Sequence, residues 1–156
     1  MWMSYRTVAL GGLISLAACN GVPEPSTPTP SAEPTLQASR PVELSITLTE
    51  LTQRPTPAGL PNRFQISSPR MAVGQATAIT WRSLDGDPQK APRSGSGILE
   101  MVDGRTIKIT LKAVDGADQP ALVLDGTLEG MQAHGSFTDR LFYARTGSFL
   151  AEIQQK

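Results

Sequence analysis

The side chains that could carry chemistry are few: one histidine, one cysteine and a set of aspartates. Nucleophilic catalysis needs a nucleophile, a base and a group that orients the base. His134 alternates with the apolar residues Ala133 and Phe137, so we expect it on the polar face of a strand, as an ordinary surface residue. No Gly-x-Ser-x-Gly elbow is present. The sequence therefore predicts neither a serine nor a cysteine hydrolase.

Paired carboxylates could still support glycoside hydrolysis. The aspartates that would have to supply them stand in turn-like stretches, several beside glycine: Asp85, Asp87, Asp103, Asp115, Asp118 and Asp125. Aspartate next to glycine is common in turns. The segment Asp85-Gly86-Asp87 also lacks the further ligands of a calcium loop. We expect turns here, with no metal and no cofactor, and a carboxylate-based hydrolase remains the enzymatic alternative.

The composition excludes several classes of protein. Fourteen Lys and Arg balance fourteen Asp and Glu among 156 residues, whereas a nucleic-acid binder needs a basic excess. One Cys and one His form neither a disulfide framework nor a four-ligand zinc site. Thirteen Pro and fourteen Gly argue against a helical bundle. The chain is long enough for one domain with a real core.

The first eighteen residues have the pattern of a secretory signal peptide. Arg6 is the one charge before a short, mostly apolar run over residues 7–16, and Ala17 and Ala18 follow. A basic start, a short apolar stretch and small residues before a cut are typical of such a peptide. The run is too short to span a bilayer, which takes about 20 apolar residues.

The sequence Leu16-Ala17-Ala18-Cys19 resembles the lipobox of bacterial lipoproteins. The resemblance implies cleavage before Cys19, a diacylglycerol on its sulfur and an acyl group on the new amino terminus. Asn20 differs from the Asp that favours the inner membrane in the enterobacterial version of this family, which mildly favours the outer membrane if the host has two. The alternatives are an ordinary secretory peptide with a chance cysteine, or a cytosolic protein with an apolar start.

Residues 19–41 are expected to form a lipidated Cys19 followed by a disordered tether. Six prolines fall between Pro23 and Pro41, with almost no large apolar side chain among them, so the segment cannot offset the entropy of ordering. A Pro-rich chain of this length reaches up to roughly 65 Å from a membrane. A proline-rich recognition ligand around Pro25–Pro28 is the alternative interpretation.

From residue 42 to residue 156 the pattern is that of strands. Residues 106–113 alternate apolar and polar side chains over their whole length, the period of a half-buried strand. Similar alternation marks seven more segments, at residues 42–51, 63–67, 76–84, 97–102, 120–128, 131–138 and 145–153. Residues 52–62 and 85–96 are expected to be loops, and Asp103-Gly104 a hairpin turn.

About eight strands with short connections predict an all-β fold, a small antiparallel meander barrel, with a β-sandwich as the alternative. Glycines at inward positions favour the barrel, because a strongly coiled strand bends at such residues. The repeats Gly135-Ser136-Phe137 and Gly147-Ser148-Phe149 are similar to hairpins in the barrel domains of some bacterial surface lipoproteins and in lipocalin-like barrels. That resemblance covers about 30 residues and implies no functional residue.

Two functions remain open on the sequence alone. The first is a non-enzymatic interaction or scaffold module, held at the membrane of the bacterial cell envelope by Cys19 and contacting a protein partner. The second is a lipocalin-like binder of a small apolar ligand, because the small inward residues would leave a cavity beside Trp81, Phe137 and Phe149. The sequence predicts neither the partner or ligand nor the oligomeric state.

Overall fold

The computed structural model describes residues 39–51, 57–114 and 118–156. These residues form eight strands: β1 (Val42–Glu50), β2 (Arg63–Ser68), β3 (Gln75–Ser83), β4 (Ser94–Met101), β5 (Thr106–Lys112), β6 (Ala121–Glu129), β7 (Gln132–Asp139) and β8 (Arg145–Gln155). The predicted signal peptide, Cys19 and most of the predicted tether lie outside the described residues.

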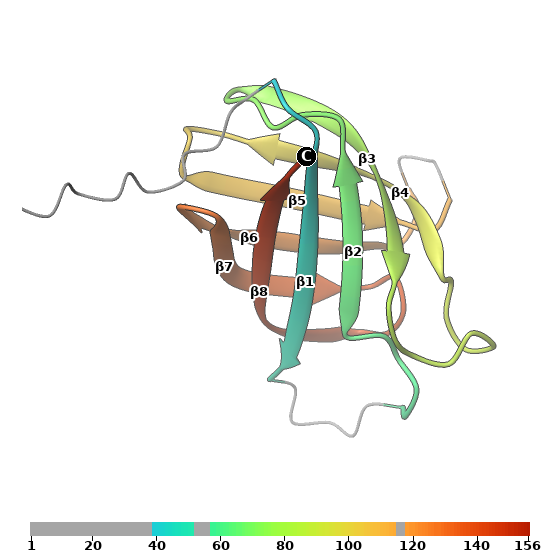
Figure 1. Cartoon of the computed structure of the whole chain (residues 1–156). Helices are drawn as coiled ribbons and strands as arrows, with labels where there is room; N and C mark the ends of the chain where they lie inside the picture. Colours follow the sequence, from blue (N-terminus) through green and yellow to red (C-terminus); the bar gives the residue numbers. More distant parts are fainter. Residues whose placement is uncertain (1–38, 52–56, 115–117) are drawn as a thin grey trace, which may run out of the picture. The chain divides into compact units, whose positions relative to one another are not determined.

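The strands form a closed barrel in which each strand pairs antiparallel with the next along the chain. The barrel closes where β8 pairs with β1 over the full length of β1, from Val42 opposite Gln155 to Glu50 opposite Gly147. In Figure 1 the red β8 accordingly lies beside the teal β1. The predicted all-β meander barrel is confirmed, and the sandwich alternative is wrong. Because the barrel closes within residues 42–155, a chain that starts at residue 19 contains the whole of it.

Alternate side chains of every strand point inward and fill the barrel. In β8, the buried and exposed positions alternate strictly over the first nine residues, as the period of two predicts. The core comprises 22 buried apolar residues contributed by every strand and by Met71 of the β2–β3 connection. The interior is therefore a packed hydrophobic core.

Glycines in the wall leave room for the aromatic rings inside. Gly147 of β8 stands opposite Phe137 of β7, and a Cβ at Gly147 would come within 2.5 Å of Cε1 of that ring. The ring of Phe149 reaches across the strand partner Gly135 to Gly126, where a Cβ would approach Cζ of Phe149 to 2.7 Å. Rings from neighbouring strands thus fill the space that side chains at Gly126 and Gly147 would take.

One predicted loop is partly wrong. Residues 94–96 were expected to be loop, but β4 begins at Ser94, so that Gly95 and Gly97 lie inside a strand. The indole Nε1 of Trp81 donates to the carbonyl oxygens of Ser96 at 3.0 Å and of Lys112 at 2.8 Å. A Cβ at Gly95 would come within 2.8 Å of that nitrogen. The start of β4 consists of small residues because Trp81 occupies the space beside them. A segment of small residues shows no alternation of apolar and polar side chains, so the sequence pattern does not predict a strand there.

Both ends of the barrel are covered. At the end of the barrel where β1 begins and β2 ends, Met71 of the β2–β3 connection is buried. At the opposite end, the ring of Phe142 stacks on Phe64, with centroids 5.7 Å apart, and meets Trp81 edge-on at 5.9 Å. Connecting segments thus supply the apolar side chains that separate the core from water.

The first prediction concerns this packing. Gly147→Ala should destabilise the barrel by about 1–3 kcal/mol, because the added methyl would overlap the carbonyl oxygen of Thr49 and the ring of Phe137. Urea unfolding followed by Trp81 emission measures the change. Ser148→Ala, an exposed neighbour on the outer face, is the matched control and should stay within about 0.5 kcal/mol of the wild type. Equal stability of both variants would contradict the packing described.

Candidate functional site

The best candidate for a binding site is a groove where β2 ends before β3 does. The pairing of β2 with β3 runs from Phe64 opposite Ser83 to Ser67 opposite Thr80 and then stops. The next residue but one, Pro69, has no N–H to continue the ladder. β3 nevertheless extends back to Gln75 and stays paired with β4 throughout that stretch. Among the described residues, no strand pairs with β3 on its β2 side between Gln75 and Ile79.

The direction of the main-chain groups in β3 follows from the bonds at its end. The N–H of Ser83 donates to Arg93 next to β4, and the N–H of Leu84 donates to Arg63 in β2. Main-chain groups alternate sides along a strand. The N–H and C=O groups of Ala78 and Ala76 therefore face the β2 side, where the ladder has ended. Both alanines are exposed.

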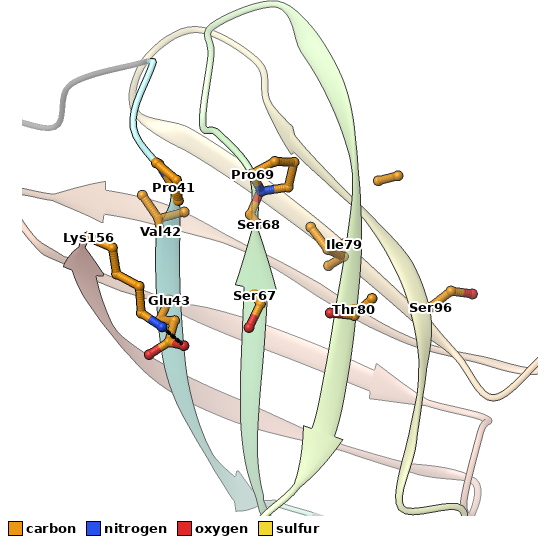
Figure 2. A pocket seen from close by; sticks show the side chains of 11 residues that line it. Pro41, Val42, Glu43, Ser67, Ser68, Pro69, Ile79, Thr80, Ser96 and Lys156 are labelled. Atoms are coloured by element: carbon orange, nitrogen blue, oxygen red, sulfur yellow. Dashed lines mark hydrogen bonds and ion pairs between the residues drawn. The ribbon is translucent and has the colours of Figure 1, made fainter.

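A groove of about 540 Å³ lies over this gap. Its lining comes from the start of β1, the end of β2, the middle of β3, one residue of β4 and the chain end: Pro41, Val42, Glu43, Ser67, Ser68, Pro69, Ala78, Ile79, Thr80, Ser96 and Lys156. Figure 2 shows Ser68 and Pro69 at the tip of β2, facing Ile79 of β3 across the gap. Inward-facing Val42, Ser68 and Ile79 line it together with outward-facing neighbours, so the groove lies along the seam of the wall.

The two charges of the groove are paired with each other. Glu43 and Lys156 form an ion pair, and Glu43 also accepts from Gln65 Nε2 at 3.3 Å. The rest of the lining is proline, aliphatic or hydroxyl-bearing. Such a site recognises a ligand by shape and by main-chain hydrogen bonds.

The hollow continues along the outer face of the sheet. A second depression of about 390 Å³ shares Ser67 and Thr80 with the groove and extends over Arg82 and Gly95. A separate hollow of about 590 Å³ lies between the start of β6 and the end of β7, around Pro120 and Arg140. The first two hollows together make an elongated depression over β2, β3 and β4.

The residues considered for catalysis are not brought together. His134 lies exposed on β7, opposite Thr127 of β6. The expectation of a turn at Asp125 is wrong, because this residue lies within β6, opposite Ser136 of β7. Asp85 accepts from the N–H groups of Asn62 and Arg63, both at 2.9 Å, and thereby joins two loops. The predicted turn at Asp103-Gly104 is a slightly longer loop, closed by the Val102 N–H bond to Thr106. The N–H groups of Thr106 and Arg105 hold the pKa of the Asp103 carboxyl below its usual value.

Within the described residues, no three His, Cys, Asp or Glu side chains lie close enough together to hold a metal ion. Asp115 lies outside those residues. The described residues contain no helix long and apolar enough to cross a membrane.

The three aromatic residues predicted to line an interior cavity are all core residues, at most 3% exposed. Trp81 lies on β3, opposite Ile66 of β2 and Gly95 of β4. Phe137 and Phe149 lie over glycines of β8 and β6. The rings are brought into one core, and the space over the small residues beside them is occupied. A ligand cavity beside Trp81, Phe137 and Phe149 stays a prediction.

The sequence analysis missed one buried ion pair. Arg145 Nε lies 2.7 Å from Asp139 Oδ2, and both side chains are at most 1% exposed. The guanidinium also donates to Asn62 Oδ1 at 2.7 Å and to the Pro61 carbonyl at 2.6 Å. Oδ1 of Asp139 accepts from the N–H groups of Leu141 and Phe142. The pair thus ties the β7–β8 connection to the segment before β2 and holds Phe142 over the core.

A signal for this pair was present in the sequence. Arg145 has the same parity as Gly147 and Phe149, which were placed inward, and Asp139 has the parity of Phe137. A charge at an inward position next to a turn can be buried when a partner of opposite charge is near.

The chain was compared with known proteins, and neither a protein-family model nor a curated protein matches it. The functional argument therefore depends on the residues of this chain.

The second prediction tests the buried pair. Arg145→Met should destabilise the barrel by about 3–5 kcal/mol, because it leaves the buried Asp139 carboxylate without its cation. The double variant Asp139→Asn/Arg145→Met should lose less than the sum of the two single variants. Urea unfolding of all four proteins gives the coupling.

Arg140→Met, an exposed arginine in the same connection, is the control and should be nearly neutral. A loss below 1 kcal/mol in Arg145→Met, or strict additivity in the cycle, would be incompatible with the buried pair described above.

Proposed function

We propose that this chain is a lipoprotein of the bacterial cell envelope, whose barrel acts as a non-enzymatic interaction module. The observation that carries the proposal is the sequence Leu16-Ala17-Ala18-Cys19 after a basic start and a short apolar run. Each buried methylene of an acyl chain contributes about 0.8 kcal/mol, and one chain alone binds a membrane only reversibly. Two or three chains on Cys19 would anchor the protein durably.

The packed core supports a role for the outer surface. Interior positions of the barrel are occupied by aliphatic and aromatic side chains, so recognition falls to the wall and its grooves. The groove over the β2–β3 seam offers hydroxyls and main-chain groups, and its two charged side chains are paired with each other. These features favour binding a partner.

One observation favours the alternative, a lipocalin-like binder of a small apolar ligand. Thr77 points inward from β3, and its hydroxyl oxygen is the one buried side-chain polar atom among the described residues that has no hydrogen-bond partner. A buried hydroxyl without a partner costs free energy, and a ligand that accepts or donates there would recover it. The two functions differ in whether the interior binds anything.

The third prediction tests the anchor. Mass spectrometry of the protein isolated from bacterial membranes should show a chain that begins at Cys19 and carries a diacylglycerol and one further acyl group. Cys19→Ser should remain unprocessed and should carry no acyl mass, because the thiol is the acceptor. Asn20→Ser, which keeps the cysteine, is the matched control and should be lipidated normally. An unmodified Cys19 in the wild type would refute the anchor.

The fourth prediction separates the two functions. Trp81 is the only tryptophan after position 2, and it lies in the core. Adding palmitate to the chain from residue 19 with Cys19→Ser should leave the emission of Trp81 unchanged, because the interior is filled. A saturable shift in emission that Thr77→Val abolishes would instead establish the carrier function.

A further inference from the structure

The edge of β3 on its β2 side has main-chain groups that no described strand pairs with. Main-chain N–H and C=O groups form strong hydrogen bonds, and an exposed strand edge is a template for pairing with another extended chain. At Ala76 and Ala78 these groups face a gap left by the end of β2. Other strands also lack a neighbour near their ends, as β8 does over residues 153–155 on its β7 side. The five residues from Gln75 to Ile79 are the longest such stretch among the described strands.

We propose that the groove over the β2–β3 seam binds an extended, uncharged peptide segment of a partner protein, which adds as a short strand to β3. The groove lining includes Ala78 and Ile79 of the unpaired stretch, and the Gln75 N–H already donates to the Ala72 carbonyl oxygen. The part open to an added strand is therefore Ala76 to Ile79, about 13 Å at about 3.3 Å per residue. It accommodates about four residues of the partner. This inference deepens the proposed interaction module, and it rests on that proposal for the class of partner.

The residues around the gap define the chemistry of the segment. The side chains beside it are short, namely Ala78, Thr80, Ser67 and Ser96, and leave space for a backbone to approach β3. Alternate side chains of an added strand would face inward, where Val42 and Ile79 lie, and should be small or aliphatic. Because the charges of Glu43 and Lys156 neutralise each other, no charge in the groove would compensate a charged segment.

The shape of the groove distinguishes a peptide from a second barrel. Pro41 and Pro69 form its rim on the β1–β2 side, and β4 bounds the opposite side through Ser96. A single extended chain fits between such walls, whereas the convex wall of a second copy would meet the rim first. The continuing depression over Arg82 and Gly95 gives the partner chain a path away from the seam.

The test is a selection of peptides by display. A library of random heptapeptides is selected on the immobilised chain from residue 19 with Cys19→Ser, so that the outcome does not depend on lipidation. The enriched peptides should carry no charged residues. At every second position, where the main chain bonds to β3, they should lack proline, and the positions between should hold small or aliphatic residues. A synthetic peptide of that sequence should bind with one-to-one stoichiometry and should slow amide exchange at Ala76 and Ala78.

Three variants make the test specific. Ala78→Pro removes an N–H that faces the gap and spares the bonds to β4, because proline is tolerated at a strand edge. Ala78→Arg places a charge in the groove. Each should weaken binding of the peptide by about tenfold or more, since main-chain hydrogen bonds or access are lost. Thr47→Arg, at an exposed outward position of β1 outside the groove, is the matched control and should bind like the wild type.

Each other outcome overturns the proposal. It is wrong if no peptide family is enriched, or if the enriched peptides bind the Ala78 variants and Thr47→Arg equally. A dimer of the wild type that Ala78→Arg dissociates would assign the groove to a second copy. Binding to a chain from residue 39 but not to one from residue 19 would assign it to this chain's own tether. Failure of the anchor would appear separately, in the mass of Cys19.

Discussion

Closure of the sheet between β1 and β8 is the constraint from which the other features follow. A closed barrel satisfies the main-chain groups that an open sheet leaves at its edges. Nine residues of β1, from Val42 to Glu50, pair with β8, so the strands with the greatest separation in sequence complete the ladder. The closed wall fixes how much side-chain volume the interior can hold. It also gives weight to the end of β2 at Ser68, because no strand among the described residues then pairs with β3 from Gln75 to Ile79 on that side.

The filling of the barrel is divided between its wall and its ends. In the wall, glycines of β4, β6 and β8 make room for Trp81, Phe149 and Phe137, respectively. At one end, Met71 covers the core. At the other end, Phe142 covers the core by stacking on Phe64. The ion pair of Arg145 and Asp139 holds the connection that carries Phe142. A buried ion pair contributes little net stability, but losing one partner is strongly destabilising. The pair therefore defines one arrangement of that end.

The strands could be predicted from the sequence because their side chains alternate with a period of two. β5 is the clearest case, since Ile107, Ile109 and Leu111 are all buried and the residues between them are polar. β4 was placed too late in the chain, because Ser94 to Gly97 have no large side chain and Trp81 supplies the apolar contact from β3. Local patterns do not contain contacts between strands.

The same limit applies to the candidate site. Pro69 was visible in the sequence, but only the register of Ser67 opposite Thr80 shows that β2 ends while the first five residues of β3 still lack a partner on that side. The partners of Arg145, at Pro61 and Asn62, lie more than eighty positions earlier in the chain and could not be paired with it by spacing. Cys19, in contrast, is a purely local signal, and the proposal that depends on it needs no fold.

Residue-resolved amide hydrogen exchange of the free protein tests the central claim most directly. A closed barrel in which β3 lacks a β2 partner between Gln75 and Ile79 predicts that protection alternates from residue to residue over that part of β3. The amides of Thr77 and Ile79, which pair with β4, should exchange only on large-scale opening, whereas those of Ala76 and Ala78 should exchange orders of magnitude faster. Uniform protection along β3 would contradict the account, because it would mean that the edge is already paired.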